Sequence, residues 1–472
     1  MKLVRDFLRA VSGGPGRGWL LIFLLGNALI NLDYGTNPES RFATLCAMVE
    51  DHSFRIDHYQ DLTIDWARTP DGHYYSNKAP GPMLLAFPAF WLIDKIITAG
   101  KADRAARDEA RLAYRWLSLK LLSLLFQALP FTVLVVIALS WLKACGVSRE
   151  ALHLSCVAML FGNTAALFMN TYFGHAVAAM CVFALCLCLI KRWYVWSGLV
   201  YGLALLADYS SAVLLPGFLV AVILQEPPKK WFESVAKISA GGVFPGVLWV
   251  LYHVSCFGGP FTLPSQYQNP MFVDTTRNQI LGIFNLAPEP TNLAQLLFGF
   301  RRGTLWSQPW VLIVLAVCLA RRTLLATVSD GRWAASLPLL RFLVPGFILL
   351  LWMNASFDKW HGGATPGPRY MCSVFPAFGL LAGLFYDGLS LGMRRLTIGA
   401  VALSVVFWVV AYSTTILVPE NQTMWGYTLG MLMNPPSYGS MVRFTGLALA
   451  FQWRLFAMWS GANTKTIAPG ST

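Results

Sequence analysis

Charged residues are scarce in this sequence. Asp, Glu, Lys and Arg make up 12% of its 472 residues, well below the roughly 25% that soluble domains carry. Hydrophobic residues make up 56%, and the mean hydropathy is +0.54. A surface this poor in charge is not adapted to water, which excludes an ordinary soluble globular protein.

The sequence also lacks the motifs of several common sites. Its nine cysteines form no Cys-x-x-Cys pair, so neither a disulfide framework nor a zinc site is indicated. No phosphate-binding glycine loop, internal repeat or low-complexity tract is present. The net charge of +13 does not indicate nucleic-acid binding, because Lys and Arg mostly flank apolar runs, where they set topology and contact anionic headgroups.

Long apolar runs are what the sequence has instead. Stretches of about 17–25 apolar residues are the length of membrane-spanning helices. We therefore predict an all-α polytopic membrane protein with about 11 or 12 transmembrane helices. The candidate spans are residues 19–32, 116–142, 150–168, 171–190, 194–207, 210–225, 234–256, 304–320, 336–354, 372–390 and 396–418, with a weaker one at 443–460.

We expect a single integral-membrane domain over residues 1–472, without a second soluble core. In it, residues 33–115 form the first extracytoplasmic loop with its juxtamembrane helices, and residues 116–472 form the transmembrane bundle. The apolar segment 80–97 is ambiguous. A full span there would move every later basic hinge to the outside, so we expect this segment to lie along the outer face or to dip into it. Whether it spans stays open.

Basic residues beside the spans predict the topology, since Lys and Arg gather in cytoplasmic loops. With these hinges inside, the long outer loops are 33–79, 257–303, 355–371 and 419–442, and they carry nearly every polar cluster. We therefore expect a cavity at the outer boundary between membrane and water. The hinges are Lys143/Arg149, Lys191/Arg192, Lys229/Lys230, Arg321/Arg322 and Arg394/Arg395.

Two residues of the first outer loop stand out. Glu39 follows Pro38 at the start of a helical pattern, where the helix dipole favours an ionised carboxylate that could act as a general base. A purely structural role at the helix start is equally compatible. Lys78 lies where the loop meets an apolar run. It either snorkels to the headgroups or binds a lipid phosphate at that depth.

The beginning of the chain resembles GT-C glycosyltransferases, in particular the branch of aminoarabinose–lipid A transferases and protein O-mannosyltransferases. Those enzymes have an acidic-x-Arg-aromatic motif in the first outer loop, followed by Tyr-x-x-Lys-x-Pro before an apolar juxtamembrane segment. The matching stretches here are Glu39-Ser40-Arg41-Phe42 and Tyr75-Ser76-Asn77-Lys78-Ala79-Pro80. The resemblance covers roughly the first hundred residues, and the general topology matches beyond them. It implies a GT-C-like bundle with an outer-face cavity.

The sequence departs from the family pattern at three places. Relatives often have Asp-Glu where this chain has Pro38-Glu39, so the acidic role falls on Glu39, with Asp33 in reserve. Some relatives use a glutamate near a metal where this chain has Asn77, and an acidic residue where it has His175. No cofactor is therefore assigned with certainty, a divalent metal stays an open alternative, and no metal ligands are assigned.

Two further clusters lie on the predicted outer side. The stretch "NASFDKWHGGATPGPRY" (354–370) combines His361 and Arg369 with glycines and prolines that exclude a regular helix. Arg301 and Arg302 precede a span and run against the positive-inside tendency, a cost that an anion held between them would explain. For both clusters, an ordinary loop is as compatible as contacts to a phosphate or a sugar.

Together these features predict a membrane glycosyltransferase. The resemblance implies a polyprenyl-phosphate-linked sugar as donor, with Glu39 or Asp33 as catalytic carboxylate. On the motifs and the outer-side clusters together, we assign binding roles to Arg41, Tyr75, Lys78, His175, Arg301, Arg302, His361 and Arg369. The acceptor is a lipid, a glycan or a protein. We expect membrane lipids but no nucleic acid as further partners. We also expect a bacterial inner-membrane location with the site facing the periplasm. The alternatives are a transporter or flippase for a lipid-linked sugar, and a ligase or polymerase of lipid-linked glycans.

Overall fold

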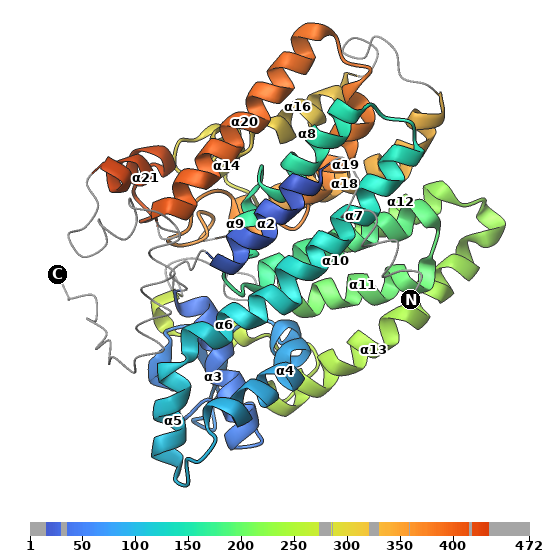
Figure 1. Ribbon diagram of the computed structural model, residues 1–472. Coiled ribbons are helices and arrows are strands. Elements are labelled where there is room, and N and C mark those ends of the chain that lie inside the picture. The colour runs from blue at the N-terminus through green and yellow to red at the C-terminus, as the bar shows by residue number, and fades with distance from the viewer. Residues whose placement is uncertain are drawn as a thin grey trace.

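The chain folds almost entirely into helices in a computed structural model (Figure 1). The structure describes residues 16–29, 35–272, 285, 287–320, 330–357, 359–414 and 418–433. Five of the described helices are long and apolar enough to cross a membrane, which confirms the prediction of an all-α polytopic membrane protein. These five are Arg115–Ala144, Gly174–Lys191, Pro228–Phe257, Gly331–Ser356 and Leu391–Tyr412. The candidate span at 443–460 lies outside the described residues.

The α-helices follow in chain order as α2 (Arg17–Leu29), α3 (Thr36–Glu50), α4 (Gly81–Ile97), α5 (Arg104–Ala113), α6 (Arg115–Ser123), α7 (Leu129–Ala144), α8 (Arg149–Leu160), α9 (Thr164–Phe168), α10 (Gly174–Lys191), α11 (Tyr194–Ala207), α12 (Leu215–Gln225), α13 (Trp231–Phe257), α14 (Pro290–Phe298), α15 (Thr304–Ser307), α16 (Pro309–Leu319), α18 (Asp330–Ser356), α19 (Phe375–Tyr386), α20 (Leu391–Thr414) and α21 (Met424–Met433). A π-helical turn, η2 (Leu124–Ala128), joins α6 to α7. Shorter 3-10 turns are η1 (Gln60–Leu62), η3 (Tyr209–Leu214), η4 (Pro228–Lys230), η5 (Pro264–Tyr267), η6 (Pro270–Phe272) and η7 (Arg369–Met371). The strands described are β1 (Trp66–Arg68) and β2 (Tyr74–Ser76), an antiparallel pair with Trp66 opposite Ser76.

The core of the bundle runs along α10 and α19. Every residue of α19 is buried, and 72% of the apolar window of α10 is buried inside the protein. A helix that is apolar on all sides belongs in the interior of a bundle. α13 is the opposite case, with 17% of its window buried, and its apolar outer face suits contact with lipid tails.

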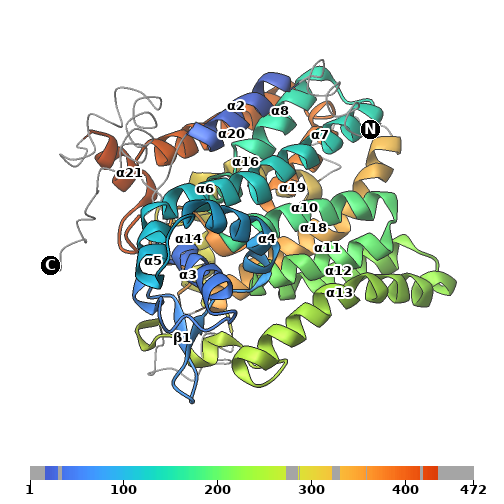
Figure 2. The same ribbon diagram turned by 60° about the horizontal axis from the view of Figure 1, so that its bottom comes forward.

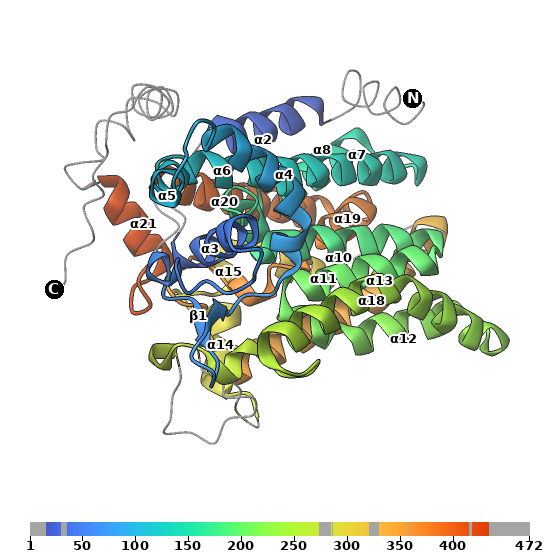
Figure 3. The same cartoon turned by 90° about the horizontal axis from the view of Figure 1, so that it is seen from below.

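The segment between α2 and α6 folds into a cap at one end of the bundle. α3, α4, α5 and the strand β1 lie together there, whereas the turn between α12 and α13 lies at the other end (Figures 2 and 3). The helix α4 contains the ambiguous segment 80–97. It is not among the described helices that are long and apolar enough to cross. Its neighbours are α3, α5, α6 and α11.

A buried arginine fastens α5 to α3 and α4. Arg111 is 1% exposed and donates to both carboxylate oxygens of Asp94, at 2.7 and 3.2 Å. It also donates to Glu50 at 2.7 Å and to Asp108 at 2.8 Å. Hydrogen bonds from Arg107 and Arg111 lower the pKa of Glu50 to about 2, although burial alone would raise it. These contacts give the cap a polar core of its own.

Replacing Arg111 should therefore destabilise the cap. Arg111→Met leaves the buried Asp94 carboxylate without its guanidinium partner, which should cost about 3–5 kcal/mol of unfolding free energy. Because the pKa of Glu50 is lowered in the folded state, its contribution should be present above its ordinary value of 4.5 and fade as the pH falls toward 2. Thermal unfolding of purified protein measures both effects. Arg104→Met, which removes a 40% exposed side chain, should change stability by less than about 1 kcal/mol, and equal losses in the two variants would contradict the prediction.

Candidate active site

A short hairpin in the cap brings Asp65 beside Lys78. The turn Thr69-Pro70-Asp71-Gly72 links β1 to β2, and Gly72 takes the positive φ of 91° that glycine adopts without strain. In the register of the pair, Asn77 N donates to Asp65 O at 3.4 Å. Lys78 is the next residue, and its Nζ lies 2.9 Å from Asp65 Oδ1.

Asp65 connects the hairpin to α3 through several hydrogen bonds. Its second carboxylate oxygen accepts a hydrogen bond from Thr36 Oγ1 at 2.8 Å, and its carbonyl accepts one from Ser40 Oγ at 2.6 Å. Burial raises the pKa of the Asp65 carboxyl, but Lys78, Thr36 and Arg369 outweigh burial and hold the pKa below its ordinary value. Asp65 is thus an ionised, buried anion that orders α3 and the hairpin together.

Lys78 and Arg369 converge on this carboxylate from distant parts of the chain. Burial lowers the pKa of Lys78, Asp65 opposes that effect, and the nearby Arg369 adds to the lowering. Arg369 begins η7, and its Nη2 donates to Tyr370 Oη at 3.0 Å. The two cations that the sequence predicted on one face therefore act on the same buried carboxylate.

Arg41 fills the space between α3, α10 and α11. Its side chain is buried and donates to the carbonyl of Asn37 at 3.3 Å and to the side-chain oxygen of Asn37. A Cβ at Gly174 would lie within 2.5 Å of Arg41 Nη2 and would also collide with Ala207 O. Burial lowers the pKa of Arg41 to about 10, while Asp208 and Asp65 are among the groups that oppose the shift. Two carboxylates, Asp208 and Asp65, therefore both act electrostatically on the Arg41 guanidinium.

His175 and Asp208 form a pair on the other side of Arg41. His175 lies in the first turn of α10, and its Nδ1 contacts Asp208 Oδ2. Asp208 also accepts a hydrogen bond from Ser210 N at 3.0 Å. The imidazole packs edge-on against Tyr370, with ring centroids 5.7 Å apart. This contact brings His175 beside the residue that follows Arg369.

Glu39 lies at the opposite side of the cluster. Its Oε1 is 3.4 Å from Arg115 Nη1, and its side chain is 17% exposed. Burial raises the pKa of Glu39 above its ordinary value, Arg115 opposes this, and Asp65 adds to it. A carboxylate that binds protons more readily than usual suits a general base. Asp33, the alternative carboxylate, lies outside the described residues.

Four predicted residues lie away from these contacts or have other partners. Tyr75 is buried against Phe257 and accepts a hydrogen bond from Arg55 Nε at 3.2 Å. Arg301 donates to Glu420 O at 3.1 and 2.6 Å. The Nε2 atom of His361 lies 3.5 Å from Glu420 Oε2. Arg302 is the fourth and holds several loops together.

Arg302 is buried and directs its guanidinium to backbone carbonyls. The acceptors are the carbonyls of Arg301, His361, Gly363, Val418 and Pro419, at 2.7 to 3.2 Å. It therefore joins the segment before α15, the loop that leads to Arg369, and the chain before α21. Its described contacts stabilise the loop that carries Arg369.

Several polar atoms around Asp65 stay unsatisfied. The buried Nε atoms of Arg41, Arg115 and Arg369 have no hydrogen-bond partner among the described residues. Buried donors without acceptors are costly, and three guanidinium groups with donors to spare make a site suited to an anion. Within the described residues, no three His, Cys, Asp or Glu side chains are grouped to hold a metal.

Asp65 and Arg115 were not predicted as members of the site, whereas Asp208, a carboxylate between two short apolar segments, is a functional candidate from the sequence or else a helix cap. The segment Pro70-Asp71-Gly72 between "WAR" and "YYS" is a strong hairpin signal. Read as a hairpin, it would have placed Asp65 next to Lys78. Arg115 carries no such local signal, because its partner Glu39 is 76 residues away in the chain.

The comparisons with known proteins add one likeness of fold. No protein-family model matches the sequence, and no curated protein matches it. Among solved structures, the chain is similar to the crystal structure of ArnT from Cupriavidus metallidurans bound to undecaprenyl phosphate. The identity is 14%, the TM-score is 0.49, and the match covers 94% of this chain and 74% of that chain. At this identity and TM-score, the likeness transfers neither a family nor a function.

The close packing of Arg41 against Gly174 predicts that a side chain at position 174 destabilises the protein. Gly174→Ala places a methyl group against Ala207 O and the Arg41 guanidinium, so it should destabilise the protein by about 1–3 kcal/mol or more. Gly392→Ala in α20, where a Cβ meets nothing within 4 Å, is the matched control and should be neutral or stabilising by about 0.5–1 kcal/mol. Thermal unfolding in the same detergent compares them. Equal melting temperatures for the two variants would show that Arg41 is not held as described.

Proposed function

We propose that this chain is a membrane glycosyltransferase that moves a sugar from a polyprenyl-phosphate-linked donor to an acceptor at the outer face of the membrane. The observation that carries the proposal is the group of buried cations around Asp65. Lys78 pairs with Asp65, and Arg41 and Arg369, which act on the same carboxylate electrostatically, each keep a buried guanidinium Nε unused. They are the groups that a lipid phosphate would need.

The proposed reaction needs a nucleophile, a proton acceptor and stabilisation of the departing phosphate. An acceptor hydroxyl forms a bond to the anomeric carbon, while the bond from that carbon to the phosphate oxygen breaks. The electron pair of the broken bond leaves with the polyprenyl phosphate, and the hydroxyl proton passes to Glu39. Lys78 and Arg369 then stabilise the charge that builds on the phosphate. Arg41 and the pair of His175 and Asp208 line the other side of the same cluster.

The position of the cluster fits a donor that stays in the membrane. The cap that carries Glu39 and Lys78 lies at one end of the bundle (Figure 3), next to the first turn of the deeply buried helix α10. A phosphate head could reach that place while its prenyl chain remains among lipid tails. We propose that this end faces the periplasm of a bacterial inner membrane, following the basic hinges at the other end.

Two other functions use similar parts. A transporter or flippase for a lipid-linked sugar would also need many spans and a basic cavity, but it requires access from both faces. A ligase or polymerase of lipid-linked glycans would also work at the outer face. The one-sided clustering of polar groups favours an enzyme over a transporter.

Incubation of the purified protein with radiolabelled polyprenyl-phosphate sugars tests the proposal. A glycosyltransferase releases free polyprenyl phosphate and transfers or hydrolyses the sugar, whereas a transporter leaves the donor intact. Donors that differ in their sugar, and a pyrophosphate-linked glycan run in parallel, separate a transferase from a ligase. Failure of every monophosphate donor to be consumed would exclude the proposed function.

The role of Glu39 gives a first prediction for the reaction. Glu39→Gln keeps the size and the hydrogen bonding of the side chain but cannot take a proton, so the rate should fall about 10²–10⁴-fold with donor binding kept. Because burial raises the pKa of Glu39, activity should rise with pH on an acidic limb whose midpoint lies above 4.5. Full activity in Glu39→Gln with a dead Asp33→Asn variant would move the base to Asp33.

The cations give a second prediction. Arg369→Ala should weaken binding of the donor about 10- to 150-fold, because a charge-assisted hydrogen bond contributes roughly 1.5–3 kcal/mol. Arg369→Lys should recover only part of this, since lysine cannot make a bidentate contact. Lys95→Ala, an exposed lysine on α4, is the control at the same end of the bundle. Equal donor affinities in the Arg369 and Lys95 variants would leave the phosphate without its proposed partner.

A further inference from the structure

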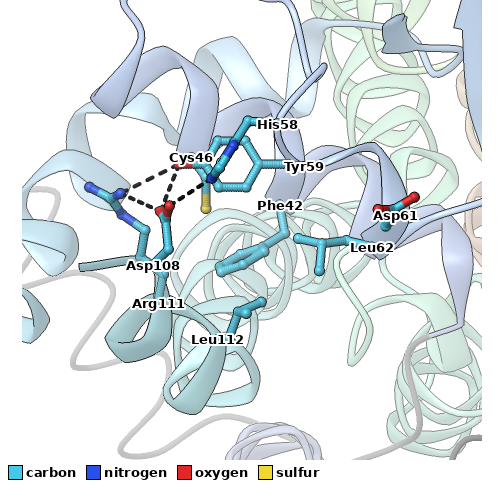
Figure 4. A pocket seen from close by; sticks show the side chains of 9 residues that line it. All are labelled: Phe42, Cys46, His58, Tyr59, Asp61, Leu62, Asp108, Arg111 and Leu112. Atoms are coloured by element: carbon cyan, nitrogen blue, oxygen red, sulfur yellow. Dashed lines mark hydrogen bonds and ion pairs between the residues drawn. The ribbon is translucent and has the colours of Figure 1, made fainter. Parts of the chain in front are cut away.

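A small pocket opens between α3, α5 and the turn η1, beside the candidate active site (Figure 4). Its volume is about 110 Å³. In the close-up, the ring of Phe42 lies between Leu62 and Leu112. The lining residues are Phe42, Cys46, His58, Tyr59, Asp61, Leu62, Asp108, Arg111 and Leu112.

The polar groups at the rim of the pocket already have partners. His58 Nε2 lies 3.0 Å from Asp108 Oδ2, and Tyr59 Oη donates to Asp108 Oδ1 at 2.8 Å. The guanidinium of Arg111 donates its hydrogen bonds to the carboxylates of Asp94, Asp108 and Glu50. What the pocket offers a ligand is therefore the apolar surface of Phe42, Leu62 and Leu112 together with the thiol of Cys46.

The geometry of the helices places this pocket next to Glu39. Phe42 and Cys46 follow Glu39 by three and seven residues, so all three lie on one face of α3. Residues one turn apart on a helix have Cβ atoms about 5–6 Å apart. The end of the pocket that Phe42 lines therefore lies about one turn of α3 from Glu39.

We propose that the pocket binds an apolar group of the acceptor, adjacent to the hydroxyl that Glu39 deprotonates. This inference rests on the proposed function and narrows the range of acceptors that the enzyme would use. A closed apolar cavity of about 150 Å³ holds a benzene molecule, so this slightly smaller and open pocket takes a short branched alkyl group. The acceptor is then an amphiphilic alcohol, with a short branched alkyl group next to its hydroxyl. A plain sugar has no such alkyl group.

Photolabelling with a small alkyl-diazirine alcohol, 2-(methyldiazirinyl)ethanol, tests the pocket without any turnover. The full-length protein in lipid nanodiscs is irradiated with the reagent, and the labelled peptides are mapped by mass spectrometry. Label is expected on the peptides that contain Phe42, Leu62 or Leu112, and excess 2-methylpropanol should suppress it. Leu112→Trp, which fills the pocket from a side chain that is 43% exposed, should reduce this labelling at least tenfold.

Leu92→Trp is the matched control, because Leu92 is 57% exposed on α4 and does not line the pocket. It should leave labelling unchanged, and thermal unfolding should show that both variants are folded. If Leu112→Trp and Leu92→Trp change the labelling equally, or if the label falls elsewhere in the chain, the pocket does not bind the alkyl group. Donor consumption that stays intact in that case leaves the proposed function unaffected. If the pocket peptides are labelled but the protein consumes no polyprenyl-phosphate sugar, the proposed function is wrong, and the assignment of the pocket to an acceptor is wrong with it.

Discussion

The ion pair between Lys78 and Asp65 is the contact on which the structure of the cap depends. A charge taken out of water is tolerated only with a partner of opposite sign and with hydrogen bonds for its remaining atoms. Asp65 meets both needs, because its carboxylate accepts from Lys78 and Thr36 while its carbonyl accepts from Ser40. Through one residue the hairpin is fixed on α3, and Glu39 and Arg41 are fixed with it.

Two kinds of buried cation can be told apart at this end. Arg111 and Arg302 direct their donors to carboxylates or carbonyls of the protein and hold helices and loops together. Arg41, Arg115 and Arg369 keep a buried Nε without an acceptor among the described residues. The first kind is complete without a ligand, whereas the second gains hydrogen bonds when an anion arrives.

The apolar spans could be predicted from the sequence, because crossing a membrane requires long apolar helices whatever the tertiary structure. The shared surroundings of Lys78 and Arg369 followed from topology, since both precede apolar segments on one predicted face. Side-chain partners could not be predicted in this way. Arg302 and Arg369 look alike in the sequence, and only the tertiary structure supplies carbonyls from residues 361–363 and 418–419 to one of them. Asp208 likewise gains its partner His175 from another helix.

The seat of Arg41 also constrains the order in which the protein can assemble. Arg41 is buried between α3, the first turn of α10 and the end of α11, where Gly174 and Ala207 close around its guanidinium. Ala207 is made 166 residues after Arg41, which at about 5–20 residues per second means on the order of ten seconds of synthesis. During that time the cap has no place for its central cation. The cap therefore cannot reach its final structure before α10 and the end of α11 have been synthesised and packed against it.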